Sequence, residues 1–491
     1  MDRREFLDVM KTSGALLAVG SPLLSACGAN DDLTAPSDGD AVDAVDLPGR
    51  NKLSFPPTLR PSGVTLDAQP GTVATSGGGT ASAWMYRRSL PGPTLRLRTG
   101  DTFRATLENG LAEETIIHWH GLDVPEAADG HPRLAVGPGE SYGYEFTVRN
   151  RAGTYWYHPH PHGRTGPQVF KGLAGFLLVD DGEADALGLP SGNHEMPLVI
   201  QDKRVDSSGA PTYVLSGSDR MQGYLGDTAF VNGSEFPYVG VERALYRLRI
   251  LNGSNARIYD LALSDGTPLT LIGTDGGLLD AATSLENILL GPGERVDVLA
   301  DFSAHTPDSR VLLQSREFDI LGGMGMGGAS RQGQPMDLLE MVVVDAVGPT
   351  RQVPGALTTL PPVPSTAGAD RQTFRFSSFM GRHLINGRSF EMDRVDARIS
   401  LGTTEVWRFV NSSPMPHPVH MHAGHFRVLS RSGGRGLLYP WEQGYKDTVL
   451  LLPFETVDVA VHFEEHRGLY LLHCHNLEHE DAGMMLNFEV V

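Results

Sequence analysis

The chain has 491 residues, with 58 glycines, 33 prolines and only 20% charged residues, a composition that suits turn-rich β domains and argues against a helical bundle or a disordered chain. At roughly 150 residues per domain, the length predicts about three domains. The net charge of -19 would repel phosphate backbones, so nucleic acid is not expected as a partner. Two cysteines stand against 18 histidines, an imbalance that favours metal chemistry over a disulfide framework.

Residues 1–27 have the pattern of an export signal. A twin arginine precedes an apolar stretch that is shorter than the ~18 residues needed to span a bilayer. The pattern resembles a twin-arginine signal, and its last four residues, Leu-Ser-Ala-Cys, resemble a bacterial lipobox in which Cys27 would carry a lipid. The alternatives are a signal cleaved elsewhere and a short buried helix. We expect export to the periplasm or cell envelope, with the acidic segment 28–51 as a flexible linker.

Two sequence markers recur along the rest of the chain at similar spacings. Three strand-like segments end in the same residue type, at Asn109, Asn252 and Asn411. A Pro-x-Glu marker that leads into an alternating strand begins at Pro138, Pro292 and Pro453. The intervals are 143 and 159 residues for the first marker and 154 and 161 for the second. Because both markers recur at nearly the same interval, they predict three related all-β domains, built as Greek-key sandwiches or barrels.

We place these domains at 52–182, 195–345 and 372–491, and call them the first, middle and third repeats. The proline-rich segment 347–369 reads as a linker.

Four short clusters in the first and third repeats hold ten of the 18 histidines: 118–120, 158–160, 417–422 and 473–479. A single His-x-His pair is commonly exposed or only supports other residues. Four such pairs in two repeats instead indicate metal ligands. His162 and His425 extend two clusters and are interpreted as supporting residues, whereas His131 and His383 have no partner pattern and are interpreted as ordinary surface or hydrogen-bonded residues.

The alternation of side chains along a strand sorts the clusters into two sites. Both members of each His-x-His pair face the same way, whereas Cys474 faces away from its two flanking histidines. His417 likewise faces away from the pair that follows it. One predicted site therefore consists of eight histidines: His118, His120, His158, His160, His420, His422, His473 and His475. The other consists of His417, Cys474, His479 and Met484, the donor set of a blue-copper electron-transfer site.

Aligning the repeats explains this asymmetry. Segment 153–160 superposes on 468–475 and puts Pro159 opposite Cys474, so the first repeat lacks the thiolate. The corresponding segment of the middle repeat, 310–318, has no histidine, and we expect it to be structural. Eight imidazoles without a thiolate or carboxylate suit a multinuclear copper centre, which should lie between the first and third repeats.

The four motifs, in this order and across nearly the whole mature chain, closely resemble those of three-domain multicopper oxidases of the bacterial laccase and cuprous-oxidase type. The resemblance implies cupredoxin-like Greek-key β-barrel domains and four copper ions. It implies a type 1 copper on His417, Cys474, His479 and Met484. It also implies a type 2 copper on His118 and His420, and a type 3 pair on the other six histidines of the eight. The reaction would take four electrons from a donor and reduce O2 to two water molecules.

Two acidic residues match positions of the same pattern. Glu480 follows His479, and Asp129 follows the first cluster. Since O2 reduction consumes protons, we expect both carboxylates to relay them. The alternative is that they only orient imidazoles.

The electron donor is the least determined feature of the sequence. Met324 and Met326 in the glycine-rich segment 322–328, and Met415 beside the third cluster, are candidates for capturing Cu(I), which thioethers favour. The alternative is a flexible loop in which methionine is incidental. Ser413 also stands where bacterial cuprous oxidases have an acidic residue, and their long methionine-rich insert is missing.

We therefore expect a laccase-like oxidase that takes electrons from phenols, aromatic amines or Cu(I) and passes them to O2. A dedicated cuprous oxidase for copper tolerance is the alternative, and a copper-binding or structural relative without catalysis is a third possibility. A two-domain nitrite reductase is disfavoured by the third repeat. Contact with a membrane is expected only through a lipid on Cys27.

Overall fold

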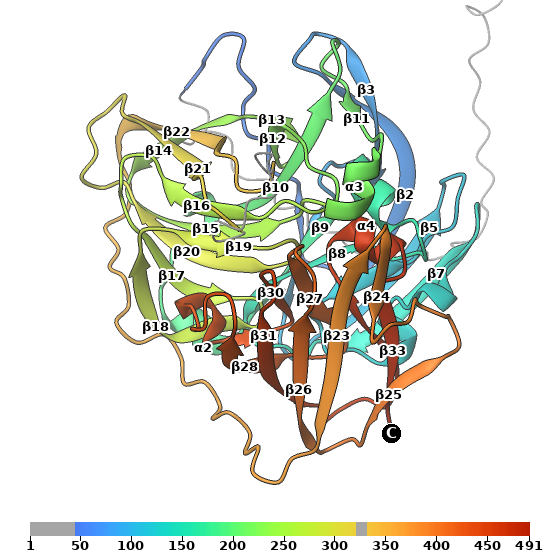
Figure 1. Ribbon diagram of the computed structural model, residues 1–491. Coiled ribbons are helices and arrows are strands. Elements are labelled where there is room, and N and C mark those ends of the chain that lie inside the picture. The colour runs from blue at the N-terminus through green and yellow to red at the C-terminus, as the bar shows by residue number, and fades with distance from the viewer. Residues whose placement is uncertain (1–44, 321–330) are drawn as a thin grey trace, which may run out of the picture. The chain divides into compact units, whose positions relative to one another are not determined.

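The computed structural model describes residues 45–320 and 331–491, all within one compact unit that spans Asp32–Val491 (Figure 1). The predicted signal with Cys27, most of the linker 28–51, and both Met324 and Met326 lie outside the described residues. In the part of the chain that is described, no helix is long and apolar enough to cross a membrane. Strands dominate this part, which confirms the predicted all-β class.

Six sheets are present in the described chain, and each draws its strands from one of three stretches: 58–180, 195–347 or 371–490. In the first stretch, one sheet has the order β3 (Thr80–Tyr86), β2 (Gly63–Ala74), β5 (Thr102–Asn109), β7 (Ser141–Thr147). The other has the order β1 (Thr58–Leu59), β4 (Thr94–Arg98), β9 (Gly175–Asp180), β8 (Gly153–Pro159), β6 (Ile117–His120). The domain boundaries 52–182, 195–345 and 372–491 stay a prediction.

The second stretch repeats this arrangement with more strands. Its larger sheet has the order β13 (Ser234–Glu235), β12 (Thr228–Val231), β10 (Glu195–Val205), β15 (Leu245–Asn252), β20 (Arg295–Asp301), β17 (Leu269–Thr274), β18 (Gly277–Leu285), with β11 (Pro211–Thr212) beside β10. Its smaller sheet has the order β14 (Tyr238–Arg243), β22 (Met336–Val347), β21 (Arg310–Ser315), β16 (Tyr259–Leu263), β19 (Ile288–Leu290).

The third stretch again forms two sheets. One has the order β24 (Arg382–Ile385), β23 (Arg371–Phe379), β26 (Thr404–Asn411), β31 (Thr456–His462), β28 (Phe426–Ser432), β29 (Tyr445–Lys446). The other has the order β25 (Val395–Ile399), β33 (Met485–Val490), β32 (Gly468–Cys474), β27 (His417–Met421), β30 (Thr448–Leu451). The described helices are short: α1 (Thr165–Lys171), α2 (Gly182–Ala186), α3 (Gly217–Gln222) and α4 (Leu477–Asp481).

Each stretch contains the same two parallel strand pairs. They are β2 with β5, β10 with β15 and β23 with β26 in one sheet, and β4 with β9, β14 with β22 and β25 with β33 in the other. The strand β5 alternates exposed and buried residues, as expected for a strand with one face on the core. The strand β8 is buried along its whole length, because both of its faces are covered.

The two sequence markers bind each other in every repeat. The backbone N–H of the asparagine donates to the carbonyl of the glutamate: Asn109 to Glu140 at 2.9 Å, Asn252 to Glu294 at 3.1 Å and Asn411 to Glu455 at 2.9 Å. The asparagine side-chain amide also donates to two loop carbonyls in each repeat, as Asn252 does to those of Arg257 and Leu290. The recurring residues therefore mark a recurring hydrogen-bonded corner.

The residue before each of these glutamates has a left-handed backbone. Gly139 and Gly293 have φ values of 80° and 82°, which glycine adopts without strain. Phe454 occupies the same place in the third repeat with φ 60°, where a side chain is unfavourable.

Candidate metal centre

Two antiparallel strand pairs bring the histidine clusters together. In the first repeat, β6 pairs with β8 so that His118 lies opposite His158. In the third repeat, β27 pairs with β32 so that His420 lies opposite His473. The side chains of the two pairs then meet across the repeats, and each of the eight histidines is at most 1% exposed. The structure thus places the predicted eight together in one buried cluster.

His118 and His420 form the first group in this cluster. Their Nε2 atoms lie 3.3 Å apart. The Nδ1 of His118 lies 2.6 Å from the Asp129 carbonyl, and the Nδ1 of His420 lies 2.9 Å from the Asp447 carbonyl, so Nδ1 carries the proton in both rings. Two unprotonated nitrogens therefore face each other, an arrangement that a cation between them would stabilise.

His160, His422 and His473 form the second group. The Nε2 atom of His473 lies 3.2 Å from that of His422 and 3.4 Å from that of His160. His422 donates through Nδ1 to Asp129 Oδ2 at 2.8 Å, which again leaves Nε2 unprotonated. The ligand atoms of these three residues lie within 4.8 Å of one another, which suits a single metal ion.

His120, His158 and His475 form the third group. His120 turns Nδ1, rather than Nε2, towards the Nε2 of His158 at 3.4 Å. The ring of His475 lies 5.1 Å from the His120 ring, and neither nitrogen of His475 has a hydrogen-bond partner among the described residues. Gly293 of the middle repeat packs on His475, and a Cβ there would come within 3.0 Å of the ring. Partnerless imidazole nitrogens held in this way fit a metal ligand.

The protonation states favour metal binding. Burial, together with the neighbouring imidazoles, lowers the pKa of His475 to about 3. Burial lowers the pKa of His160 to about 4, although Glu480 opposes the shift. Neutral imidazoles are the form that binds metals, and an all-nitrogen donor set suits copper or zinc better than magnesium or calcium.

The thiolate site lies on the opposite side of β32. The Cys474 Sγ atom lies 3.4 Å from Nδ1 of His417 and 3.7 Å from Nδ1 of His479. Ser413 Oγ holds the other nitrogen of His417 at 2.8 Å, and the Met221 carbonyl holds that of His479 at 3.0 Å. Burial raises the pKa of the Cys474 thiol, so a bound cation is needed to keep it deprotonated.

Met484 completes the predicted thiolate site. It is fully buried, its carbonyl accepts from the Cys474 N–H at 3.0 Å, and its N–H donates to the His479 carbonyl at 2.9 Å. The backbone therefore places this residue beside both ligands. Thiolate, two imidazoles and a thioether form a soft donor set that fits copper.

The two predicted acids both contact the eight-histidine cluster. Asp129 holds His422 through Oδ2, and burial raises the pKa of Asp129. Its buried Oδ1 has no hydrogen-bond partner among the described residues and lies 3.7 Å from Nδ1 of His118. Glu480 Oε2 lies 3.2 Å from Nδ1 of His473, and Oε1 lies 3.6 Å from Nε2 of His160. Burial opposes ionisation of Glu480, but these histidines hold its pKa below the usual range. Both positions suit orienting imidazoles and holding protons.

The remaining predicted residues are less engaged. Met415 is partly buried, and its hydrogen bonds to Asn411 and Ser413 are made by its backbone. His425 lies 3.7 Å from Asp447, and His162 packs 5.2 Å from Phe390. Both therefore lie outside the three ligand groups.

Three residues near the sites escaped the sequence analysis. His383, given no role there, is buried and stacks on His479 with ring centroids 3.9 Å apart. Asp447 lies 3.0 Å from Nε2 of His120, and Arg295 of the middle repeat binds Asp447. None of them belongs to a histidine motif, because their relation to the ligands exists only across repeats or between sheets.

Comparison with known proteins adds independent information. Two multicopper oxidase family models match the chain, one at residues 67–184 and the other at 358–491. The multicopper oxidase mco of Staphylococcus aureus is 32% identical over 455 residues, covering 90% of this chain and 93% of the relative. The cell division protein FtsP of Dickeya dadantii is 33% identical, covering 98% and 97%. The crystal structure of a laccase from Pediococcus acidilactici is 34% identical, with a TM-score of 0.80 over 89% of this chain and 93% of that one. With the six sheets, this likeness confirms the cupredoxin-like Greek-key class.

Proposed function

Because this chain belongs to the multicopper oxidase family, a copper-dependent class with O2 as acceptor, we propose that it is a laccase-like oxidase. It would couple one-electron oxidation of phenols, aromatic amines or Cu(I) to the four-electron reduction of O2 to water. In this proposal His417, Cys474, His479 and Met484 hold a type 1 copper. His118 and His420 hold a type 2 copper, and the other six clustered histidines hold a type 3 pair.

The observation that carries the proposal is the position of Cys474. Its sulfur lies between His417 and His479, while the residues bonded to it, His473 and His475, turn their rings into the eight-histidine cluster. One strand thus links the two donor sets by a short covalent path. Bound copper would supply one-electron redox chemistry, and four ions would store the four electrons that O2 takes up.

The surrounding residues hold the imidazoles and the protons. Backbone carbonyls and carboxylates fix the Nδ1 protons of His118, His420 and His422, so that each presents Nε2 to the cluster. Asp129 Oδ1 is a buried oxygen with no hydrogen-bond partner among the described residues, and Glu480 Oε2 lies 3.2 Å from Nδ1 of His473. Each offers a place to hold a proton that O2 reduction will consume.

We place the electron donor near His479, on a surface that adjoins His383. The α3 carbonyl of Met221 binds His479 Nε2, and His383 covers one face of its ring, so a donor meets these covering groups first. The turn between β23 and β24 adjoins them, because the Gly381 N–H contacts the Met221 sulfur at 2.7 Å. Phe379, the last residue of β23, and Met380 of this turn are 74% and 81% accessible. An aromatic ring beside a thioether suits both phenols and Cu(I).

The test compares Cu(I) and a phenol as donors, side by side, on the native protein and on a deletion of 322–328. A laccase-like oxidase should oxidise both donors with one O2 consumed per four electrons, and the deletion should leave the phenol rate unchanged and Cu(I) oxidation measurable. A dedicated cuprous oxidase should instead lose Cu(I) oxidation with the deletion. Failure of the native protein to oxidise the phenol would refute the laccase-like proposal.

A structural or copper-binding role without catalysis is the second candidate, since relatives that are 33% and 34% identical to this chain are named cell division protein FtsP. The complete set of soft donors in this chain favours catalysis, because a purely structural role needs neither the Cys474 thiol nor partnerless buried imidazoles. Absence of O2 uptake by copper-loaded protein with every donor tested would favour the structural role.

We also propose that the chain is exported and anchored to the cell envelope through a lipid on Cys27. The lipobox-like sequence supports this proposal. Mass spectrometry of the mature amino terminus, compared between native protein and Cys27→Ala, tests it. An unlipidated native terminus would contradict the anchor.

A further inference from the structure

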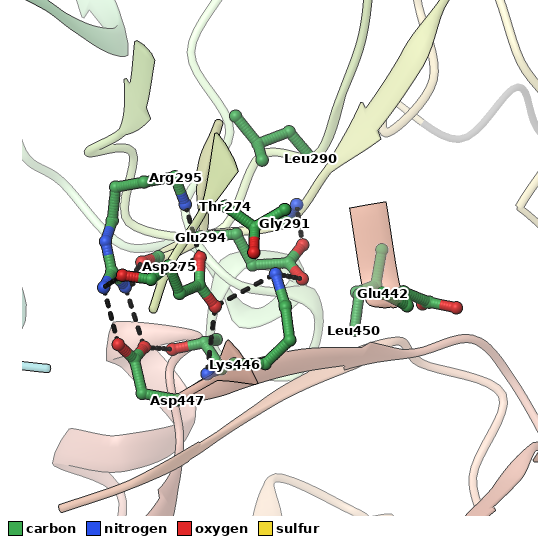
Figure 2. Close-up of polar contacts among 12 residues, drawn as sticks. Thr274, Asp275, Leu290, Gly291, Glu294, Arg295, Glu442, Lys446, Asp447 and Leu450 are labelled. Atoms are coloured by element: carbon green, nitrogen blue, oxygen red, sulfur yellow. Dashed lines mark hydrogen bonds and ion pairs between the residues drawn. The ribbon is translucent and has the colours of Figure 1, made fainter. Parts of the chain in front are cut away.

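Five buried charged residues join the middle and third repeats beside the histidine cluster: Asp275, Glu294, Arg295, Lys446 and Asp447 (Figure 2). We propose that Arg295, from the repeat without histidine ligands, is a positioning residue of the eight-histidine site. It acts by holding Asp447, which in turn fixes the ring of His120. The inference rests on the proposed copper site.

Arg295 has a complete set of hydrogen-bond partners. Its five N–H donors reach Thr154 O at 2.9 Å, Gly293 O at 3.0 Å, Asp275 O at 3.1 Å, and Asp447 Oδ1 and Oδ2 at 2.7 and 2.5 Å. These acceptors come from all three repeats. The planar guanidinium therefore fixes both oxygens of one carboxylate while it is itself fixed by three carbonyls.

Asp447 decides which nitrogen of His120 faces the cluster. Its Oδ1 lies 3.0 Å from Nε2 of His120 and also accepts from Thr448 Oγ1 at 2.9 Å. A carboxylate accepts hydrogen bonds, so Nε2 of His120 must carry the proton and Nδ1 must be free. His120 accordingly presents Nδ1 to the cluster, unlike His118, His420 and His422.

The neighbouring cation cannot replace Arg295. Lys446 Nζ lies 2.9 Å from Asp275 and 3.0 Å from Glu294, so it is already engaged with the other two acids (Figure 2). Without Arg295, three buried carboxylates would share one ammonium group. Asp447 would then lose its two-pronged partner, and the His120 ring would lose its fixed acceptor.

A matched buried arginine separates positioning from general stability. Arg247, also in the middle repeat, binds Asp297 at 2.5 Å and is only 6% exposed. Its side chain pairs with the carboxylates of Asp297 and Glu195 rather than with a group that holds a histidine. Substituting either arginine breaks a buried ion pair, but only Arg295 is joined to the cluster.

The experiment compares copper-loaded Arg295→Met and Asp447→Asn with the control Arg247→Met. Copper per chain after dialysis against a chelator, the paramagnetic resonance of the ions in the histidine cluster and the thiolate-to-copper absorption are measured. We expect Arg295→Met and Asp447→Asn to bind copper at the histidine cluster ~10–100-fold more weakly, with an altered resonance and an unchanged thiolate absorption. The control should melt at a lower temperature and keep all its copper.

Full copper and an unaltered resonance in Arg295→Met, with a melting loss like that of the control, would overturn the inference. If Arg295→Met does not fold, Arg295→Lys is read by the same criteria, since lysine keeps the charge but not the two-pronged contact. Failure of the native protein to load the histidine cluster would instead overturn the proposed function, so the two failures are distinguishable.

Discussion

The strands β8, β21 and β32 occupy equivalent places in their sheets, yet only β8 and β32 end in candidate metal ligands. The segments of β8 and β32 run into His158, His160, His473 and His475, whereas β21 ends at Ser315 without a histidine. The middle repeat contributes groups that hold ligands instead, such as the Met221 carbonyl on His479. One scaffold thus serves two purposes, and a repeat without ligands still shapes the sites.

The largest expected effect comes from changing the end of one of these strands. Cys474→Ser removes the only thiol in the described residues and the link between the two sites. We expect turnover to fall by more than the ~10–100-fold typical of residues that merely support a ligand, with loss of the thiolate-to-copper absorption. Ser315→Ala, at the end of β21, is the matched control and should retain turnover. Comparable losses in both variants would break the distinction between the repeats.

The next largest effect is expected at Glu480, beside the third repeat's ligands. Glu480→Gln keeps the shape but cannot hold a proton as a carboxylate does, so steady-state turnover should fall on the order of 10²-fold. Anaerobic reduction of the Cys474 site by a phenol should keep its rate, because that step needs no proton for O2. If turnover per bound copper is unchanged in Glu480→Gln, Glu480 does not deliver protons and only orients His473.

One contribution of the middle repeat, made by Glu195, is expected in stability rather than turnover. Burial opposes ionisation of Glu195, but Arg249, Arg96 and Arg247 lower its pKa to about 2. A pKa depressed in the folded state stabilises the protein above the ordinary value near 4.5 and ceases to do so as pH falls towards 2. The contribution is about 3 kcal/mol at neutral pH.

Urea unfolding of copper-loaded native protein and Glu195→Gln, from pH 7 down to pH 3, measures this contribution. The native protein should be the more stable at neutral pH, and the difference should shrink below about pH 4.5. A difference that stays constant across this range would show that the Glu195 charge is not what stabilises the repeat.

The smallest expected effect comes from substitutions in the hydrogen-bonded corner that all three repeats share. Phe454→Gly should stabilise the third repeat by about 1 kcal/mol, because glycine relieves the left-handed strain. Gly139→Ala should have the opposite sign, since a Cβ there meets nothing within 4 Å and only the backbone strain is added. Thermal melts of both variants measure the effect, and shifts of the same sign would show that the corners are not equivalent.

Much of this molecule was predictable because its information is local or repeated. The markers at Asn109, Asn252 and Asn411 recur because each closes the same corner, so their period revealed the repeated β architecture. Strand alternation likewise assigns Cys474 and His473 to opposite faces of one strand, and therefore to different sites. Such patterns need only the sequence.

The remainder depends on contacts that no local pattern encodes. Arg295 reaches Asp447 across 152 positions of sequence, and His383 of β24 meets His479 of α4. An arginine after a Pro-Gly-Glu turn has many structural uses, so its sequence alone did not indicate a partner. Met324 and Met326 lie outside the described residues, and so the choice of donor rests on the proposed experiments.

The two donor sets come from different numbers of chain segments, and this difference affects the order in which metal ions can be inserted. The residues proposed for the type 1 ion all come from a single segment, 417–484, whereas the eight histidines come half from 118–160 and half from 420–475. A folded carboxyl-terminal repeat therefore contains all four residues of one donor set, whereas the eight-histidine cluster exists only once the first and third repeats have docked. If both donor sets bind copper as proposed, metal insertion follows an order set by folding, with the ion on Cys474 seated before the ions of the histidine cluster.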